Sequence, residues 1–201
     1  MLELLVAYWI LYYSVHSLLA APRWKAAVFA RWPATVRFYR LAYNQLSVWL
    51  FLAVLRYQAT LPATALWKHK VEFVSMGGGL LVAGLVLAIL ALRGYDLGEF
   101  AGWRYVRYGS SAGAGPLRVT GLNAVVRHPL YLGMLVLLVG WILLYPTVPW
   151  LIFVGCAAAY VVVGAQLEER KLKRQFGEAY QLYQRRVPQL FPLWPRRISS
   201  I

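Results

Sequence analysis

The sequence predicts an all-α polytopic membrane protein with five transmembrane helices and a C-terminal amphipathic helix in the cytoplasm. Of the 201 residues, 61% are hydrophobic and the mean hydropathy is +0.55, which is more apolar surface than the core of one soluble domain can bury. The 21 Lys and Arg residues far outnumber the 7 Asp and Glu residues. They stand in short blocks between apolar runs, a pattern typical of cytoplasmic loops that face anionic lipid headgroups.

Five stretches approach the roughly 20 apolar residues that a helix needs to cross the hydrocarbon core of a bilayer. They cover residues 2–21, 39–57, 73–92, 129–145 and 148–167. The first stretch contains Glu3 and has no basic segment at its start. We therefore expect it to remain as a span and not to be removed as a signal peptide.

Small residues gather in the third stretch. They are Gly77, Gly78, Gly79, Ala83, Gly84 and Ala88. Small residues four positions apart in an apolar helix predict close packing against another helix in lipid. A nucleotide-binding loop would need a strand before it and a helix after it, and the sequence pattern predicts neither.

The basic residues set the expected orientation. Those between the first two stretches are Arg23, Lys25, Arg31, Arg37 and Arg40, and those between the third and fourth are Arg93, Arg104, Arg107, Arg118 and Arg127. These connections and the basic C-terminal tail face the cytoplasm by the positive-inside rule. The N-terminus is then outside the inner membrane, and the C-terminus is in the cytoplasm. Nucleic acid is not an expected partner, because no basic helix stands apart from the membrane segments.

The last two stretches are joined by a turn at residues 146–150, which is short enough to require an antiparallel helical hairpin. The open ends of this hairpin, near His128 and Glu168, are expected to meet at the cytoplasmic surface. After Glu168 the chain is polar but keeps apolar residues at helical spacing, which predicts the amphipathic helix. Gly177 is expected to interrupt this helix and Pro188 to end it. An interfacial anchor of Phe191, Trp194, Arg196 and Arg197 is expected to follow.

Two segments at the hairpin ends carry candidate chemistry. In residues 127–133, a proline at the first position of a span leaves backbone amides available for an anion or a carboxylate. The alternative is a plain cytoplasmic anchor. Glu168 and Glu169 are placed to accept hydrogen bonds from ribose hydroxyls or to attract a cationic cofactor. The alternative is a solvated pair neutralised by Arg170 and Lys171.

Three elements taken together resemble a known family. They are Arg127-His128-Pro129-x-Tyr131-x-Gly133, then Glu168-Glu169, then Phe176-Gly177-x-x-Tyr180-x-x-Tyr183 with Val187-Pro188. This order and spacing is similar to the C-terminal signature of the isoprenylcysteine carboxyl methyltransferases and their bacterial relatives. The run of residues 161–170 most resembles the methanethiol S-methyltransferases and the related membrane proteins of the nitric-oxide-reduction accessory group. Residues 16–20 and 39–44 are similar to that branch too.

The resemblance implies an S-adenosylmethionine site. The matching cofactor-binding positions are Leu117, Arg118, His128, Pro129, Leu130, Tyr131 and Glu168. Glu168 is preferred to Glu169 because nine residues separate it from Gly177, as in the family, and adjacent helical residues point about 100° apart. Gly164 stands where the isoprenylcysteine enzymes have an arginine for the substrate carboxylate. A prenylcysteine substrate is therefore not expected.

His16 is the one ionisable side chain well inside a predicted span, which makes it a candidate catalytic residue for deprotonating or orienting a thiol. The alternative is a structural hydrogen bond to a neighbouring helix. Arg37, Arg40, Tyr43 and Asn44 are candidate substrate-binding residues at the cytoplasmic end of the second stretch. No metal site is predicted.

The sequence thus predicts one integral membrane methyltransferase domain over residues 1–201, with the substrate side in residues 1–92 and the cofactor-binding part in 93–201. The expected reaction is methyl transfer to a small or lipophilic acceptor, foremost a thiol that reaches the site from the bilayer. Two alternatives stay open: methylation of a phospholipid or other lipid headgroup, and a non-catalytic accessory role. Membrane lipids are expected partners, and the oligomeric state is left open.

Overall fold

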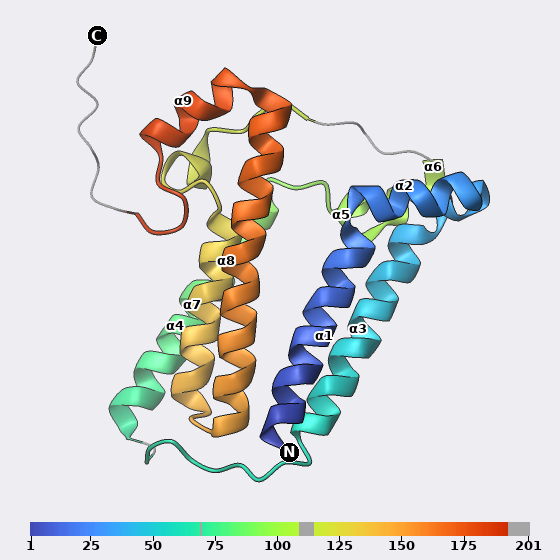
Figure 1. Ribbon diagram of the computed structural model, residues 1–201. Helices are drawn as coiled ribbons and strands as arrows, with labels where there is room; N and C mark the ends of the chain where they lie inside the picture. Colours follow the sequence, from blue (N-terminus) through green and yellow to red (C-terminus); the bar gives the residue numbers. More distant parts are fainter. Residues whose placement is uncertain (69, 109–114, 193–201) are drawn as a thin grey trace. The chain divides into compact units, whose positions relative to one another are not determined.

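The computed structural model describes residues 1–68, 70–108 and 115–192 (Figure 1). Their helices are α1 (Leu2–Ala20), α2 (Pro22–Arg31), η1 (Pro33–Arg37), α3 (Tyr39–Gln58), α4 (Val71–Leu92), α5 (Leu97–Ala101), α6 (Trp103–Tyr108), η2 (Gly121–Ala124), α7 (Pro129–Leu144), α8 (Val148–Phe176) and α9 (Glu178–Arg186). The predicted all-α class is confirmed for this part of the chain. Trp194, Arg196 and Arg197 of the expected anchor lie outside the described residues.

Each of the five predicted spans is a helix, and for α1, α3, α4 and α7 the ends agree with the prediction within two residues. The exception is α8, which continues past Leu167 to Phe176 and has 29 residues. Such a helix is roughly 43 Å long, whereas the hydrocarbon core is about 30 Å thick. The charged turns that follow Leu167 therefore extend beyond the hydrocarbon core.

Among the described helices, α1, α4 and α8 are long and apolar enough to cross a membrane, and α7 is a shorter apolar helix. These helices also leave large apolar side chains uncovered, such as Leu11, Val82 and Val163, which are 59%, 64% and 53% exposed. Apolar surface of this kind is covered by lipid in an integral membrane protein. By contrast α3 has the length of a span but carries Arg40 and Arg56.

The chain forms two compact units. Unit 1 contains Met1–Lys68, Tyr95–Ala114 and Pro146–Cys156, and unit 2 contains His69–Gly94, Gly115–Tyr145 and Ala157–Ile201. The first turns of α8 belong to unit 1 and its remaining turns to unit 2. This grouping differs from the expected boundary at residue 92, because α4 joins the C-terminal helices. The assignment of substrate and cofactor to the two halves stays a prediction.

In unit 1, α1 and α3 lie side by side (Figure 1). The centre of their packing is Trp9 of α1. Trp9 is fully buried, and its ring centroid lies 5.5 Å from that of Phe51 and 4.9 Å from that of Phe153. Its indole Nε1 donates a hydrogen bond of 3.1 Å to Gln58 Oε1. The indole N–H and a buried amide thus satisfy each other inside an aromatic core.

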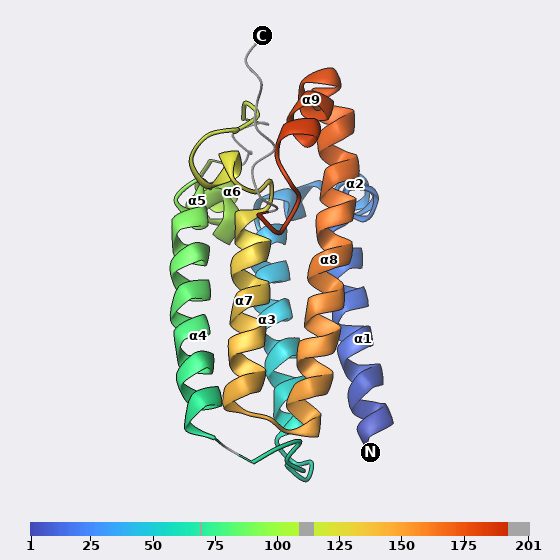
Figure 2. The same cartoon turned by 90° about the vertical axis from the view of Figure 1, so that its left-hand side faces the viewer.

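In unit 2, α4 and α7 run side by side at glycine contacts (Figure 2). A Cβ placed on Gly84 would lie 2.8 Å from the carbonyl oxygen of Gly133, and one on Gly77 would lie 3.0 Å from that of Gly140. Only hydrogen atoms leave room for this approach of two backbones. The predicted packing role is therefore confirmed for Gly77 and Gly84.

The packing role is wrong for Gly78 and Gly79. A Cβ on either residue would meet nothing within 4 Å among the described residues. Each step along a helix turns the side chain by about 100°, so neither residue shares the face of Gly77 and Gly84.

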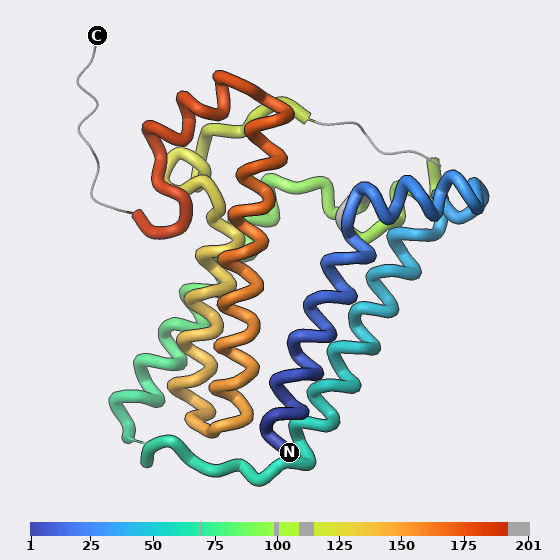
Figure 3. Tube along the Cα trace, viewed as in Figure 1, coloured from blue at the N-terminus to red at the C-terminus, as the bar shows by residue number. Residues whose placement is uncertain are grey.

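At the end of α8 the chain reverses into α9 (Figure 3). Gly177 has φ +55°, a conformation that residues with a Cβ adopt rarely. The helix after it ends at Arg186, two residues before Pro188. The expected interruption at Gly177 and the expected end before Pro188 are both confirmed, and α9 buries Tyr180 and Tyr183.

We predict that Gly84→Ala lowers the free energy of unfolding by about 1–3 kcal/mol, because the added methyl group overpacks the α4–α7 contact. Gly78→Ala, six residues earlier in the same helix, should leave stability nearly unchanged. Thermal unfolding of the two detergent-solubilised variants beside the wild-type protein measures the difference. Equal midpoints for both variants would contradict the contact.

Candidate functional site

The start of α7 lies beside the segment that follows α9 in unit 2. His128 is the N-cap of α7 and Pro129 its first helical residue. Proline suits this position, because its missing N–H is one that a first turn leaves without a helical partner. The backbone N–H groups of Arg127 and His128 donate to the carbonyl oxygens of Pro188 and Gln189, at 2.9 Å and 3.1 Å.

The Glu169 carboxylate is the centre of this region and is only 8% exposed. Arg127 binds it with two N–H groups, Nε to Oε1 at 2.7 Å and Nη2 to Oε2 at 3.0 Å. His128 Nε2 lies 2.8 Å from Oε1, and the Tyr180 hydroxyl donates to the same oxygen at 2.8 Å. The Gln184 side-chain amide donates to Oε2. Both carboxylate oxygens are thus filled by protein donors.

These contacts determine the ionisation of the cluster. Burial raises the pKa of the Glu169 carboxyl, but hydrogen bonds from Arg127, Tyr180 and His128 and the positive charge of Arg127 lower it, with a net pKa of about 2. Burial and the hydrogen bond to Glu169 raise the pKa of the Tyr180 hydroxyl. Glu169 therefore remains an acceptor and Tyr180 a donor across the physiological pH range.

Glu168 occupies a different environment from its neighbour. Its side chain is 35% exposed, and its Oε2 lies 3.7 Å from Nδ1 of His128. The His128 ring stacks on the Tyr131 ring, with centroids 5.5 Å apart and an interplanar angle of 26°. The structure thus brings together His128, Tyr131 and Glu168, as the hairpin predicted, and the backbone amides of the first turn of α7 lie at the same end.

The other predicted cofactor positions are less closely tied to this group. Leu117 and Arg118 lie in an irregular segment before η2, and a Cβ on Gly94 at the end of α4 would lie 3.4 Å from Arg118 Nη1. Leu130 is half-buried in the first turn of α7. The carbonyl oxygen of Asn123 accepts a hydrogen bond from Tyr183, so Asn123 helps to hold α9.

In unit 1, His16 lies between two hydroxyl groups of α3. Its Nδ1 is 3.0 Å from Ser47 Oγ, and its Nε2 is 2.7 Å from the Tyr43 hydroxyl. Ser47 gives its own hydrogen to the carbonyl oxygen of Tyr43 at 2.8 Å, so its Oγ must accept a hydrogen from Nδ1. In the neutral ring Nε2 is then the basic nitrogen, and it accepts from the Tyr43 hydroxyl.

Three of the predicted substrate residues contact unit 1 itself. Arg37 Nε donates to the carbonyl oxygen of Val106, and the Asn44 side chain donates to that of Ala101 at 3.0 Å. The Arg40 guanidinium lies 5.7 Å from the centroid of the Tyr105 ring. These residues attach α5 and α6 to η1 and α3, whereas Tyr43 lies against His16. Their role in substrate binding stays a prediction.

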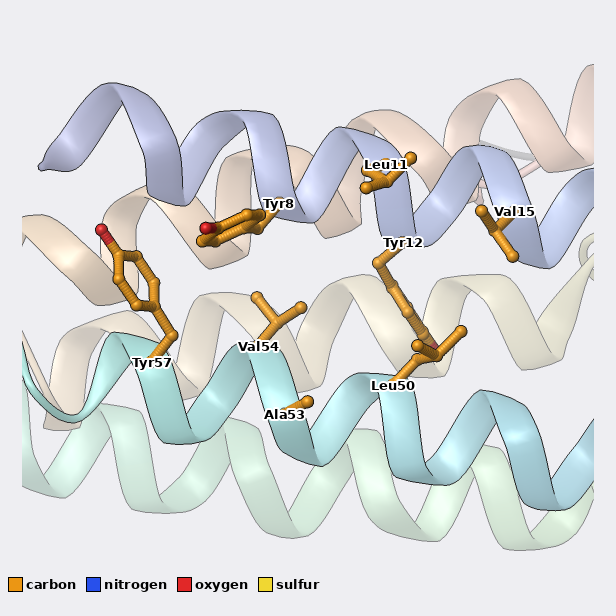
Figure 4. Close-up of a pocket in the computed structure, with 8 residues that line it drawn as sticks. All are labelled: Tyr8, Leu11, Tyr12, Val15, Leu50, Ala53, Val54 and Tyr57. Atoms are coloured by element: carbon orange, nitrogen blue, oxygen red, sulfur yellow. The ribbon is translucent and has the colours of Figure 1, made fainter.

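An apolar pocket of about 270 Å³ lies between α1 and α3 (Figure 4). Its lining residues are Tyr8, Leu11, Tyr12, Val15, Leu50, Ala53, Val54 and Tyr57. The ring of Tyr12, one of these residues, lies 6.0 Å from the His16 ring, between centroids. In the described part of the chain, no group of three or more His, Cys, Asp or Glu side chains is arranged to hold a metal ion.

Sequence reasoning missed the central role of Glu169. The idea that Arg170 and Lys171 neutralise both carboxylates is wrong for Glu169, because its ion-pair partner is Arg127, 42 residues away. Tyr180 and Gln184 were also not expected to bind it. The available signal was the helical spacing of Tyr180 and Tyr183 after Gly177, which showed a buried face but not its partner.

The fold and the site define an integral membrane protein of long apolar helices, with a buried ionic cluster at the start of α7 and the charged end of α8. Comparison with known proteins shows that the chain belongs to the NnrU protein family, which matches residues 4–195. The resemblance inferred from the sequence motifs is thereby confirmed. No solved structure gives a significant match to the chain.

Several curated relatives are named methanethiol S-methyltransferases. Methanethiol S-methyltransferase 2 of Bradyrhizobium diazoefficiens is 33% identical over 189 residues, which is 90% of this chain and 70% of the relative. The enzyme of Pseudomonas deceptionensis is 40% identical over 86 residues, 43% of this chain and 32% of the relative. That of Crocosphaera subtropica is 45% identical over 67 residues, 33% of this chain and 26% of the relative. The last two matches thus cover about a third or less of those relatives.

We predict that Glu169→Gln destabilises the protein at pH 7 by roughly 3 kcal/mol, the free energy that corresponds to lowering the carboxyl pKa from 4.5 to about 2. Because this pKa is lowered by folding, the stabilisation is complete above pH 4.5 and is lost as the pH falls to 2. The gap between wild type and variant in thermal unfolding should therefore close over that range. Glu168→Gln is the matched control and should show a small change at every pH.

Proposed function

We propose that this protein is a membrane-bound methyltransferase that transfers a methyl group from S-adenosylmethionine to a small lipophilic thiol, of which methanethiol is the prime candidate. The observation that carries this proposal is the similarity to methanethiol S-methyltransferase 2 over 90% of the chain. The long apolar helices support a substrate that enters from the bilayer.

The arrangement in unit 2 suits such a cofactor. Glu168 offers an accessible carboxylate, His128 and Tyr131 offer a stacked pair of rings, and the first turn of α7 offers backbone N–H donors. When bound, S-adenosylmethionine supplies an electrophilic methyl group on a sulfonium. The chain itself would hold that group in line with the acceptor and keep water away, because displacement at a sulfonium needs little covalent help.

Substrate selection is proposed to depend on what surrounds Gly164. A Cβ on this residue would lie 4.0 Å from the Tyr131 hydroxyl. Because the residue is a glycine, the chain has no arginine at the position where the isoprenylcysteine enzymes are expected to bind a carboxylate. This supports an uncharged acceptor over a prenylcysteine.

Deprotonation of the thiol is assigned to His16. Its Nε2 is the basic nitrogen of the neutral ring, because Ser47 holds the hydrogen of Nδ1. Tyr43 bonds to that nitrogen at 2.7 Å and would either move aside or pass the proton on. The His16 imidazole would take the proton of the thiol, which leaves a thiolate as the nucleophile.

We further propose that α1, α3, α4, α7 and α8 all cross the inner membrane, with the N-terminus outside and the C-terminus in the cytoplasm. The basic residues of alternate connections support this orientation. A reporter that is active only in the periplasm should be inactive when fused to the C-terminus and active when fused to the N-terminus. The reverse pattern would refute the orientation.

Purified protein in detergent should convert methanethiol and S-adenosylmethionine to dimethyl sulfide, which gas chromatography of the headspace detects. His16→Ala should lower turnover at least tenfold while affinity for S-adenosylhomocysteine stays within about twofold. Formation of a methylated lipid in place of dimethyl sulfide would favour the headgroup alternative. Absence of both product and cofactor binding would favour an accessory role.

The cofactor assignment predicts that Glu168→Gln weakens S-adenosylhomocysteine binding about tenfold to a hundredfold, the effect of losing a charge-assisted hydrogen bond. Glu178→Gln is the matched control, since it removes an exposed carboxylate from α9. Calorimetric titration measures both. Full affinity in Glu168→Gln would show that Glu168 does not face the cofactor.

A further inference from the structure

The proton on His128 is fixed by its neighbour Glu169. Arg127 binds both oxygens of that carboxylate with parallel N–H groups, at 2.7 Å and 3.0 Å, a geometry that requires the ionised form. An ionised carboxylate has no hydrogen to donate. The 2.8 Å contact between Glu169 Oε1 and His128 Nε2 is a hydrogen bond only if Nε2 carries the hydrogen.

In the neutral ring the opposite nitrogen, Nδ1, is then an acceptor. The His128 side chain is 5% exposed, and Nδ1 lies 3.7 Å from Glu168 Oε2. This separation is too long for a hydrogen bond, and the carboxylate is an acceptor as well. No described residue supplies a hydrogen to Nδ1.

We propose that Glu169 is a positioning residue that holds His128 in the Nε2–H tautomer, so that His128 Nδ1 and Glu168 Oε2 form a paired acceptor for hydrogen-bond donors of the bound cofactor. This inference rests on the proposed function. The paired acceptor takes neighbouring N–H or O–H groups and rejects the cofactor's carboxylate. Three parts of the cofactor carry such donors: the ammonium group, the ribose diol and the adenine amino group.

The adjacent carboxylates thereby divide one task. Glu169 is filled by Arg127, Tyr180 and Gln184 in addition to His128, so it has little capacity left for a ligand. Glu168 keeps an accessible oxygen. If Glu169 were only structural, it would hold α9 against α8 and would not decide which nitrogen of His128 carries the proton. The tautomer of His128 therefore distinguishes the two roles.

The first measurement is the tautomer of His128 in the protein without ligand. The chain has three histidines, so ¹⁵N-histidine labelling with a His128→Asn variant assigns the ring signals. At pH 8 we expect the Nε2–H form. Glu169→Gln should shift the ring toward Nδ1–H, because its amide can donate to Nε2. Tyr180→Phe, which removes another hydrogen bond from Oε1, should keep the wild-type tautomer.

The tautomer alone can overturn the proposal. A wild-type ring in the Nδ1–H form, or protonated on both nitrogens at pH 8, would do so even if Glu169→Gln fails to fold. An Nε2–H ring that persists in a folded Glu169→Gln variant would also do so.

The second measurement is calorimetric binding of two ligands. S-adenosylhomocysteine and 5′-methylthioadenosine share the ribose diol and the adenine amino group, but only S-adenosylhomocysteine has the ammonium group. Glu169→Gln should weaken S-adenosylhomocysteine about tenfold with Glu168 intact. If Glu168→Gln weakens both ligands equally, the donor belongs to the adenosine part. If it weakens only S-adenosylhomocysteine, the donor is the ammonium group.

Two outcomes separate the failures. Unchanged affinity for both ligands in Glu168→Gln and in folded Glu169→Gln would overturn the paired acceptor while cofactor binding stands. A wild-type protein that binds neither ligand would remove the proposed function and with it the ligand part of this inference, whereas the tautomer would still report on Glu169.

Discussion

The ion pair between Arg127 and Glu169 is the interaction on which the candidate site depends. It joins the approach to α7 and the charged turns of α8. Arg127 Nη1 also binds the carbonyl oxygens of Gln184 and Val187 at the end of α9. Both side chains are about nine-tenths buried. A buried pair of this kind adds little net stability compared with apolar packing, but breaking it leaves an uncompensated charge. The pair is therefore costly to separate, and the donors of His128, Tyr180 and Gln184 hold the carboxylate in place.

The consequence for chemistry lies in the difference between two neighbouring carboxylates. A rotation of about 100° per residue turns Glu169 into the protein and leaves Glu168 at the edge, 35% exposed. One becomes a fixed part of the scaffold, and the other keeps a free edge beside His128 and Tyr131. The same rotation distinguishes Gly84, which touches the α7 backbone, from Gly78, which does not.

Unit 1 uses polar groups in a different way. The hydroxyls of Ser47 and Tyr43 lie on either side of His16 between α1 and α3. Hydrogen bonds between helices are a common way to satisfy polar groups away from water, and here they also fix which nitrogen of His16 is basic.

The sequence by itself determined most of the long helices and α9. Apolar length set α1, α3, α4 and α7 within two residues, and Gly177 and Pro188 set the limits of α9, because these features act within one segment. It also predicted that His128 and Glu168 meet, because two helices joined by a short turn must pack antiparallel. Only the tertiary structure decided which carboxylate is buried and that Arg127 pairs with Glu169 across 42 positions. Such partners depend on the rotation of each helix about its own axis. A single sequence shows which residues share one face of a helix, but it does not show which face of another helix packs against them.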